Sequence, residues 1–257
     1  GGKVSVAAAH VFDDVDAALM LHPDTKNSLG GRTLAIYPLR FEFFGQNAHA
    51  CTPQNGKSAL DATVMSYMSI NLLRQFAEPN TFIHGVIAHG GEAANVIPAY
   101  ASLEYYFRGE TMEYVKELCE KAKQCVEGAC TMCGCTSRIT TYECPYDDCV
   151  INYTLADMLK DKFHELGYDW EGVDETPQGS SDVGSVSYCC PTLQGYIKIA
   201  DSSVNGHSRE LAAATISPQG TQALLGGDLA LADIGRRLIT EPETLQKAWQ
   251  EMDKLRK

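Results

Sequence analysis

The spacing of apolar and polar residues between positions 38 and 142 predicts a regular series of strands and helices. Leu39, Phe41 and Phe43 alternate with outward-facing residues, as in a strand with one buried face. The order of the predicted elements is β-α-β-β-α-β, which is typical of a ferredoxin-like unit with a four-stranded antiparallel sheet and two helices on one face. The remaining elements are predicted as a helix over 59–76, strands over 81–88 and 96–108, a helix from Thr111 and a strand over 136–142.

The segments on either side of this unit have a different pattern, in which short apolar strands occur among helices. Such alternation indicates an α/β layer domain. We therefore predict an α/β domain formed by residues 1–37 and 150–257, with a ferredoxin-like α+β unit inserted at 38–149. The elements predicted in the flanks are strands over 16–21 and 192–199 and helices over 152–166 and 219–239.

The composition excludes some classes of function. The net charge is −12 and Lys and Arg do not cluster, so a nucleic-acid partner is not expected. No apolar run approaches the roughly 20 residues that span a bilayer, and the first residues do not resemble a secretory signal. Ten cysteines in a chain of 257 residues do not indicate a disulfide scaffold, so we predict free thiols and a cytoplasmic location.

Three histidines lie in contexts that favour chemistry. His22 ends an apolar stretch and precedes Pro23, and functional side chains of α/β proteins gather at strand ends. His49 lies in a loop rich in small residues after the first strand of the inserted unit, and His207 lies in a polar turn with Gly206. A small neighbour lets a ligand approach the imidazole without steric cover.

Two further features each allow two interpretations. The cysteines between positions 119 and 149 could hold zinc or an iron–sulfur cluster, but Cys119, Cys125 and Cys130 fall mostly at apolar positions of the predicted helix, where a thiol behaves as a small hydrophobic group. Asp182 could contact a substrate or orient a ligand, or it could cap the turn that follows it.

Five segments in order resemble motifs of metal-dependent amidohydrolases and peptidases of the aminoacylase and carboxypeptidase type. The resemblance covers nearly the whole chain and is closest to p-aminobenzoyl-glutamate hydrolase and related Xaa-Arg-type dipeptidases. It implies that the flanking domain is catalytic and that the inserted unit is a lid and dimerisation domain. The matching segments are 11–23, 45–62, 90–98 together with Arg108, 179–187 and 206–208.

The resemblance also implies a mechanism. Two divalent ions, zinc or manganese, activate a water molecule and polarise the scissile amide of an N-acyl amino acid or a dipeptide. By this resemblance His22 and His207 are metal ligands, and His49 crosses the interface of a homodimer to stabilise the oxyanion.

The same resemblance assigns the substrate carboxylate to two residues of the inserted unit. Asn95 and Arg108 would hold it, since the planar guanidinium of arginine forms paired hydrogen bonds with carboxylates. Asp182 is the third predicted substrate-binding residue.

This sequence departs from the family pattern at its start. The bridging metal ligand, a further metal-binding histidine and the glutamate pair would lie upstream, and a catalytic zinc needs about three protein ligands. We therefore expect the catalytic domain to be incomplete, as in an N-terminally truncated chain, and the isolated chain to have little activity. The alternative is a non-catalytic dimerisation or binding protein that retains the lid domain.

Overall fold

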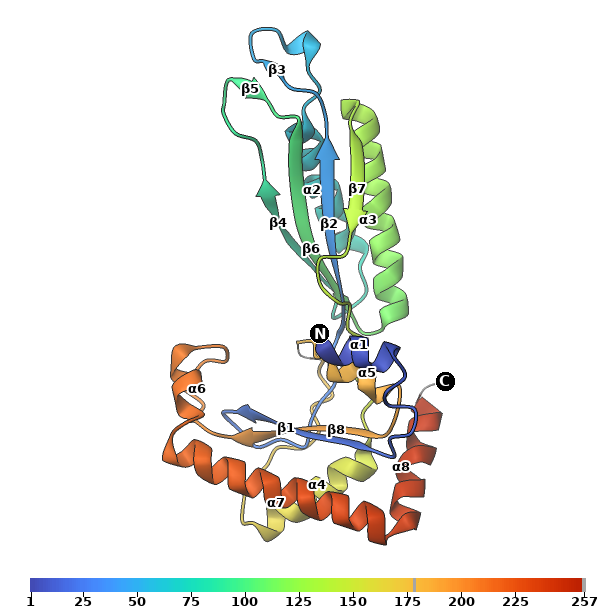
Figure 1. Ribbon diagram of the computed structural model, residues 1–257, viewed down its shortest axis with the longest axis vertical. Helices are drawn as coiled ribbons and strands as arrows, with labels where there is room; N and C mark the ends of the chain where they lie inside the picture. The colour runs from blue at the N-terminus through green and yellow to red at the C-terminus, as the bar shows by residue number, and fades with distance from the viewer. Residues whose placement is uncertain (178, 256–257) are drawn as a thin grey trace. The chain divides into compact units, whose positions relative to one another are not determined.

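The structure, a computed structural model, describes residues 1–177 and 179–255 and divides into two compact units. Unit 1 consists of Gly1 and Leu34–Asp147, and unit 2 of Gly2–Thr33 and Asp148–Lys257. Unit 1 begins and ends slightly earlier than the inserted unit predicted at 38–149. Figure 1 labels the helices and strands of both units.

Unit 1 is built on a four-stranded antiparallel sheet with the strand order β4-β6-β2-β7. The predicted β-α-β-β-α-β order is present among its sheet strands and helices. A separate pair of two-residue strands, β3 and β5, was not predicted. The elements are β2 (Ala35–Phe44), β3 (Ala48–His49), α2 (Ala59–Leu72), β4 (Phe82–His89), β5 (Val96–Ile97), β6 (Tyr100–Gly109), α3 (Met112–Cys133) and β7 (Thr136–Thr140), with short 3-10 helices at Pro53–Asn55 and Leu73–Phe76.

One face of this sheet forms the core of unit 1. Phe41 and Phe43 of β2 and Tyr105 and Phe107 of β6 are fully buried, and they pack in one cluster with residues of both α2 and α3. Both helices therefore cover the same face, as the β-strand alternation predicts. Figure 1 shows α2 and α3 alongside the sheet of unit 1.

Two predicted elements differ from the observed ones. The helix predicted over 59–76 ends as an α-helix at Leu72 and closes with a 3-10 turn, Leu73–Phe76. The strand predicted over 96–108 is interrupted at Pro98, which separates β5 from β6. Proline has no backbone N–H to donate to a sheet ladder, so the pairing breaks there.

The helices of unit 1 begin and end at residues suited to those positions. The Ser58 hydroxyl accepts a hydrogen bond from the Asp61 N–H at 3.1 Å at the start of α2. The Thr111 hydroxyl accepts one from the Tyr114 N–H at 3.3 Å at the start of α3. Gly134 ends α3 with a φ of +66°, a left-handed conformation that glycine adopts without strain.

Unit 2 contains a two-stranded parallel sheet, in which β1 pairs with β8, and six helices within the described residues. The strand predicted over 16–21 begins and ends later, because the ladder continues through His22 and Pro23 to Asp24. Helix α1 was not predicted. The elements are α1 (Gly2–Ala8), β1 (Ala18–Asp24), α4 (Tyr153–Glu165), α5 (Val183–Ser187), β8 (Thr192–Lys198), α6 (Arg209–Ala214), α7 (Pro218–Thr240) and α8 (Pro242–Leu255).

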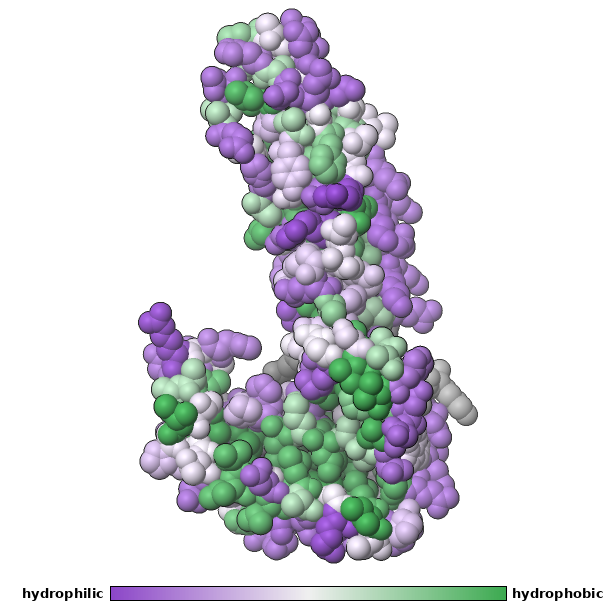
Figure 2. All heavy atoms as spheres, in the orientation of Figure 1, coloured by the Kyte–Doolittle hydropathy of each residue, from purple (hydrophilic) through white to green (hydrophobic). Residues whose placement is uncertain are grey.

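The core of unit 2 forms where α4 and α7 pack against the sheet. Leu159 and Phe163 of α4 and Ile234 of α7 are fully buried in one cluster with Leu193 of β8. Other apolar side chains of this unit are exposed, and Figure 2 shows hydrophobic residues over a broad part of its visible face. The exposed side chains of α7 include Leu224, Leu225 and Leu229.

The cysteines of α3 behave as small hydrophobic residues. Cys119 and Cys130 are buried in the core of unit 1, and burial raises the pKa of the Cys119 thiol to about 12. All ten cysteines have free thiols. Among residues 1–177 and 179–255, no three His, Cys, Asp or Glu side chains gather to hold a metal ion, so the described part of the chain offers no cysteine metal cluster.

Candidate functional site

Unit 2 contains a cavity of about 520 Å³ that His22 and His207 both line. His22 lies near the carboxyl end of β1, paired in register with Tyr196 of β8. His207 lies in the loop between β8 and α6. Two imidazoles that are far apart in the sequence thus face one cavity at the end of a parallel sheet, which is where α/β proteins bind ligands.

The imidazole of His22 is oriented by a backbone carbonyl. Its Nδ1 lies 2.9 Å from the Pro23 carbonyl oxygen, which can only accept a hydrogen bond. The proton therefore sits on Nδ1 and leaves the lone pair of Nε2 available, an arrangement that is common for metal-binding histidines. The His22 ring also lies against the Tyr196 ring, with centroids 5.7 Å apart.

The backbone holds His207 in an uncommon conformation. Its φ is +57°, in the left-handed region, which costs free energy for a residue with a side chain. Immediately after it, the Ser208 hydroxyl accepts a hydrogen bond from the Leu211 N–H at 3.1 Å and starts α6. The loop and the helix cap therefore place the imidazole at the cavity.

The residues of this cavity fit part of a metal centre. Two neutral imidazoles are suitable ligands for zinc or manganese. Within the described residues, however, no group of three His, Cys, Asp or Glu side chains comes together. His22 and His207 can thus supply two ligands of a centre, and the described residues do not complete it.

Asp182 does not line this cavity, and its carboxylate is bound to Lys3. Oδ1 lies 2.8 Å from the Lys3 ammonium nitrogen, and Oδ2 accepts a hydrogen bond from the Lys3 N–H at 3.2 Å. Burial acts to raise the pKa of Asp182, but the contacts with Lys3 outweigh it and lower that pKa. The carboxylate forms no cap on α5. The observed contacts join α1 to α5, a role that neither sequence interpretation included.

In unit 1, β3 and β5 hold His49 and Asn95 side by side. His49 pairs in register with Val96, and the Ala50 N–H donates to the Asn95 carbonyl at 3.0 Å. The Nδ1 of His49 accepts a hydrogen bond from the Cys51 N–H at 3.1 Å. In a neutral imidazole the proton then sits on Nε2, where it can be donated to a ligand.

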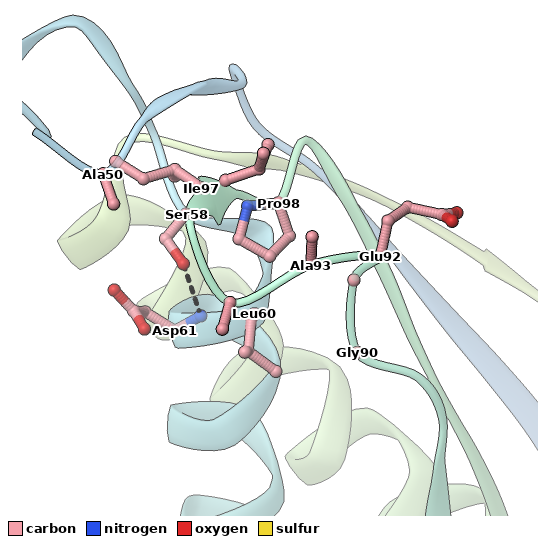
Figure 3. Close-up of a pocket in the computed structure, with 12 residues that line it drawn as sticks. Ala50, Ser58, Leu60, Asp61, Gly90, Glu92, Ala93, Ile97 and Pro98 are labelled. Atoms are coloured by element: carbon pink, nitrogen blue, oxygen red, sulfur yellow. Dashed lines mark hydrogen bonds between the residues drawn. The ribbon is translucent and has the colours of Figure 1, made fainter. Parts of the chain in front are cut away.

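A cleft of about 490 Å³ lies beside this pair, between the loop after β4 and the start of α2. Figure 3 shows Ser58 and Asp61 at the helix start, joined by a hydrogen bond, and Pro98 across from them. The Glu92 side chain points away from the cleft in this view. Asn95 is not among the residues that line it.

Arg108 lies at the other end of β6, paired with Ile36 of β2 and Phe82 of β4. Since a strand rises about 3.3 Å per residue, Arg108 is roughly 25 Å from the end of β6 that adjoins β5 and Asn95. Its Nε is buried and has no acceptor among the described residues. The guanidinium carbon lies 5.9 Å from the centre of the Tyr106 ring.

A second basic side chain lies close to Arg108. His84 pairs with Tyr106 on the neighbouring strand, and its ring lies 5.8 Å from the Tyr106 ring. Burial, followed by the charges of Arg108 and Arg74, lowers the pKa of His84. The guanidinium of Arg108 lies at this end of β6, where its positive charge would favour an anionic group.

Sequence reasoning missed three polar residues of the unit 2 cavity. Thr33, Ser180 and Gln194 line it together with the two histidines. Ser180 falls in a segment that matched the family motif, but no pattern marks Thr33 or Gln194. Threonine and glutamine are common on protein surfaces, so only the folded structure identifies Thr33 and Gln194 as cavity residues.

The fold and the cavity together characterise this class of protein. The chain combines an α/β unit that has a histidine-lined cavity with a β-α-β-β-α-β unit inserted into it. Residues 36–130 match the family described as "Peptidase dimerisation domain". On this match, residues 36–130 form a peptidase dimerisation domain of the M20 type. The similarity to the first relative below extends over 96% of the chain.

The relatives are peptidases and amide hydrolases. The chain is similar to the Xaa-Arg dipeptidase of Mus musculus, with 31% identity over 96% of this chain and 58% of that protein. It is also similar to one of the subunits of the p-aminobenzoyl-glutamate hydrolase of Escherichia coli, with 34% identity over 64% of this chain and 34% of that protein.

Solved structures agree on the fold. The aminobenzoyl-glutamate utilization protein of Klebsiella pneumoniae matches 89% of this chain and 56% of its own, with 20% identity and a TM-score of 0.67. The chain thus spans little more than half the length of the first relatives it matches. In the described part of the chain, no helix has the length and hydropathy needed to cross a membrane. The cytoplasmic location stays a prediction.

Proposed function

We propose that this chain forms part of a metal-dependent hydrolase that cleaves an amide bond next to a free carboxylate. The substrate class is an N-acyl amino acid such as p-aminobenzoyl-glutamate, or a dipeptide, in line with the names of the relatives. The observation that carries the proposal is the cavity shared by His22 and His207. Both were predicted as ligands from separate motifs.

In this proposal His22 and His207 bind divalent ions, and the remaining ligands and the catalytic glutamate are supplied from outside these 257 residues. A bound zinc or manganese ion would acidify a water molecule and polarise the amide carbonyl. The Nε2 of His22 is available for this role because Nδ1 is held by the Pro23 carbonyl. We therefore expect slow hydrolysis, or none, by the 257-residue chain alone with added zinc.

The predicted site residues of unit 1, the catalytic His49 and the substrate-binding Asn95 and Arg108, divide into two groups in this proposal. His49 and Asn95 lie together, whereas Arg108 lies roughly 25 Å away along β6. Because one amino-acid carboxylate cannot span that distance, both groups can act on one substrate only if two protomers contribute. His49 and Asn95 of one protomer would then complete the site that contains Arg108 of its partner.

The experiment that tests substrate binding is replacement of Arg108 by glutamine. Loss of a charge-assisted hydrogen bond to a carboxylate costs about 1.5–3 kcal/mol, so the Kd for p-aminobenzoyl-glutamate is expected to rise roughly ten- to hundredfold. Isothermal titration calorimetry on the full chain measures it. Arg236→Gln is the matched control, because Arg236 is an exposed arginine of α7 paired with Asp233. An unchanged Kd in Arg108→Gln would contradict the assignment.

Unit 1 has the surface expected of a dimerisation domain. Val64, Met68, Leu72 and Phe76 follow one another at intervals of four residues and are 38%, 58%, 71% and 87% exposed. This apolar stripe runs along α2 and ends at Phe76 in the 3-10 turn that follows the helix. Helix α2 packs against the edge strand β4. We propose that two copies of the chain associate through the stripe and the open edge of β4.

Met68→Glu is expected to convert the dimer to monomers. In a two-fold symmetric interface the charge is introduced twice, and burying an unpaired carboxylate is costly, so the dimer Kd should rise by roughly 100-fold or more. Size-exclusion chromatography with light scattering measures the mass. Leu229→Glu is the control, because Leu229 is exposed to a similar extent, 57%, but lies on α7 in unit 2. A dimer that survives Met68→Glu would rule out this interface.

A further inference from the structure

Three buried oxygen atoms around the unit 2 cavity have no hydrogen-bond partner among the described residues. They are Thr33 Oγ1, Ser180 Oγ and Gln194 Oε1, and all three residues line the cavity. Thr33 is only 6% exposed. A buried polar atom without a partner costs free energy, so three around one cavity indicate a place where a polar ligand supplies the missing partners.

The orientation of the Gln194 side chain defines which hydrogen-bonding groups this ligand must have. Its Nε2 donates a hydrogen bond to the Tyr196 hydroxyl at 3.0 Å, which leaves Oε1 as the unpaired end. A carbonyl oxygen can only accept a hydrogen bond. The hydroxyls of Thr33 and Ser180 can also accept, so a group with several N–H donors would satisfy all three atoms.

The charge of the residues that line the cavity also favours a ligand with N–H donors. Among the lining residues that the structure describes there is no Lys or Arg, and apart from the two histidines Asp24 is the residue with a formal charge. A carboxylate would meet unpaired acceptors and the Asp24 charge without a basic partner. A neutral amide or a guanidinium would be favoured at the same position.

We propose that Thr33, Ser180 and Gln194 form a subsite that binds an N–H donor group of the substrate, an amide or a guanidinium, in the cavity of His22 and His207. The place of this subsite in catalysis rests on the proposed function. The subsite would bind the end of the substrate opposite to its carboxylate. Gln194 is its specificity-determining residue, since its free oxygen accepts hydrogen bonds and cannot donate them.

Direct binding to the metal-free chain tests the subsite. Isothermal titration calorimetry in the presence of EDTA is done with n-butylguanidinium, butanamide and butanoate, which all carry a short unbranched alkyl chain. The two N–H probes are expected to bind at least tenfold more tightly than butanoate. Gln194→Leu should weaken n-butylguanidinium binding roughly tenfold, and Gln194→Glu, which adds a carboxylate, should strengthen it.

The controls separate this subsite from folding and from the metal site. Gln246→Leu, at an exposed position of α8, should leave binding unchanged, and circular dichroism verifies that each variant is folded. Because the protein is metal-free, failure of zinc binding or hydrolysis would affect the proposed function and leave this result standing. Tighter binding of butanoate, no binding of either N–H probe, or unchanged binding by Gln194→Leu would overturn the subsite.

Discussion

The zinc affinity of the chain is expected to fall roughly 100-fold when His22 is replaced by alanine, and as far when His207 is replaced. Loss of an outer-shell partner of a metal ligand already costs about 10- to 100-fold in affinity, and alanine here removes the ligand itself. Among the described residues, no three His, Cys, Asp or Glu side chains are placed to hold a metal ion together, so no other ligand is in position to replace the lost imidazole. Competition with a fluorescent zinc indicator on the full chain measures the affinity.

His164→Ala provides the control for this experiment. His164 is an exposed histidine of α4 in the same unit and does not line the cavity, so its loss should leave zinc binding unchanged. Equal losses in all three variants would indicate adventitious binding to surface imidazoles. Zinc binding that depends on His22 but not on His207 would separate the two residues and remove the shared centre. It would then favour the alternative in which the chain is a non-catalytic binding protein.

The β-α-β-β-α-β unit was readable from the sequence because its pattern is local. Alternation along β2 and β6 follows directly from the period of a strand, and the start of α3 at Thr111 follows from cap chemistry. The predicted elements were wrong where the backbone departs from a regular strand or α-helix. Pro98 breaks one predicted strand into two, and the 3-10 turn after Leu72 shortens the predicted helix.

The candidate site was predictable only in part, since its residues come together through tertiary contacts. His22 and His207 were found because each lies in a segment that resembles a family motif. The three unpartnered oxygens of Thr33, Ser180 and Gln194 were not found, because a residue's burial and its lack of a partner are properties of the fold.

Asp182 is a further residue whose contacts could not be predicted from the sequence. Its motif favoured a role toward a substrate or a turn, but its carboxylate is bound to Lys3. Lys3 lies at the far end of the sequence, in a helix that the pattern did not predict. No local spacing relates the two residues, so the ion pair could be recognised only once α1 and α5 were seen to pack together.

Phe43→Ala is expected to destabilise unit 1 by about 3–5 kcal/mol, the usual cost of removing a buried phenylalanine. Phe43 is fully buried in the core of that unit. Its neighbour Phe44 is 37% exposed and lies on the opposite face of β2, where it contacts Tyr100 and Arg138. Phe44→Ala should therefore cost only about 1 kcal/mol.

This pair tests the register of β2, because a shift of one residue would exchange the two side chains between faces. Urea unfolding followed by circular dichroism measures the midpoint. Tryptophan fluorescence serves as an internal reference, since the two tryptophans of the chain, Trp170 and Trp249, both lie in unit 2. Equal midpoints for Phe43→Ala and Phe44→Ala would contradict the register. They would also contradict the ladder that sets Arg108 opposite Ile36 and Phe82, on which its place at the end of β6 depends.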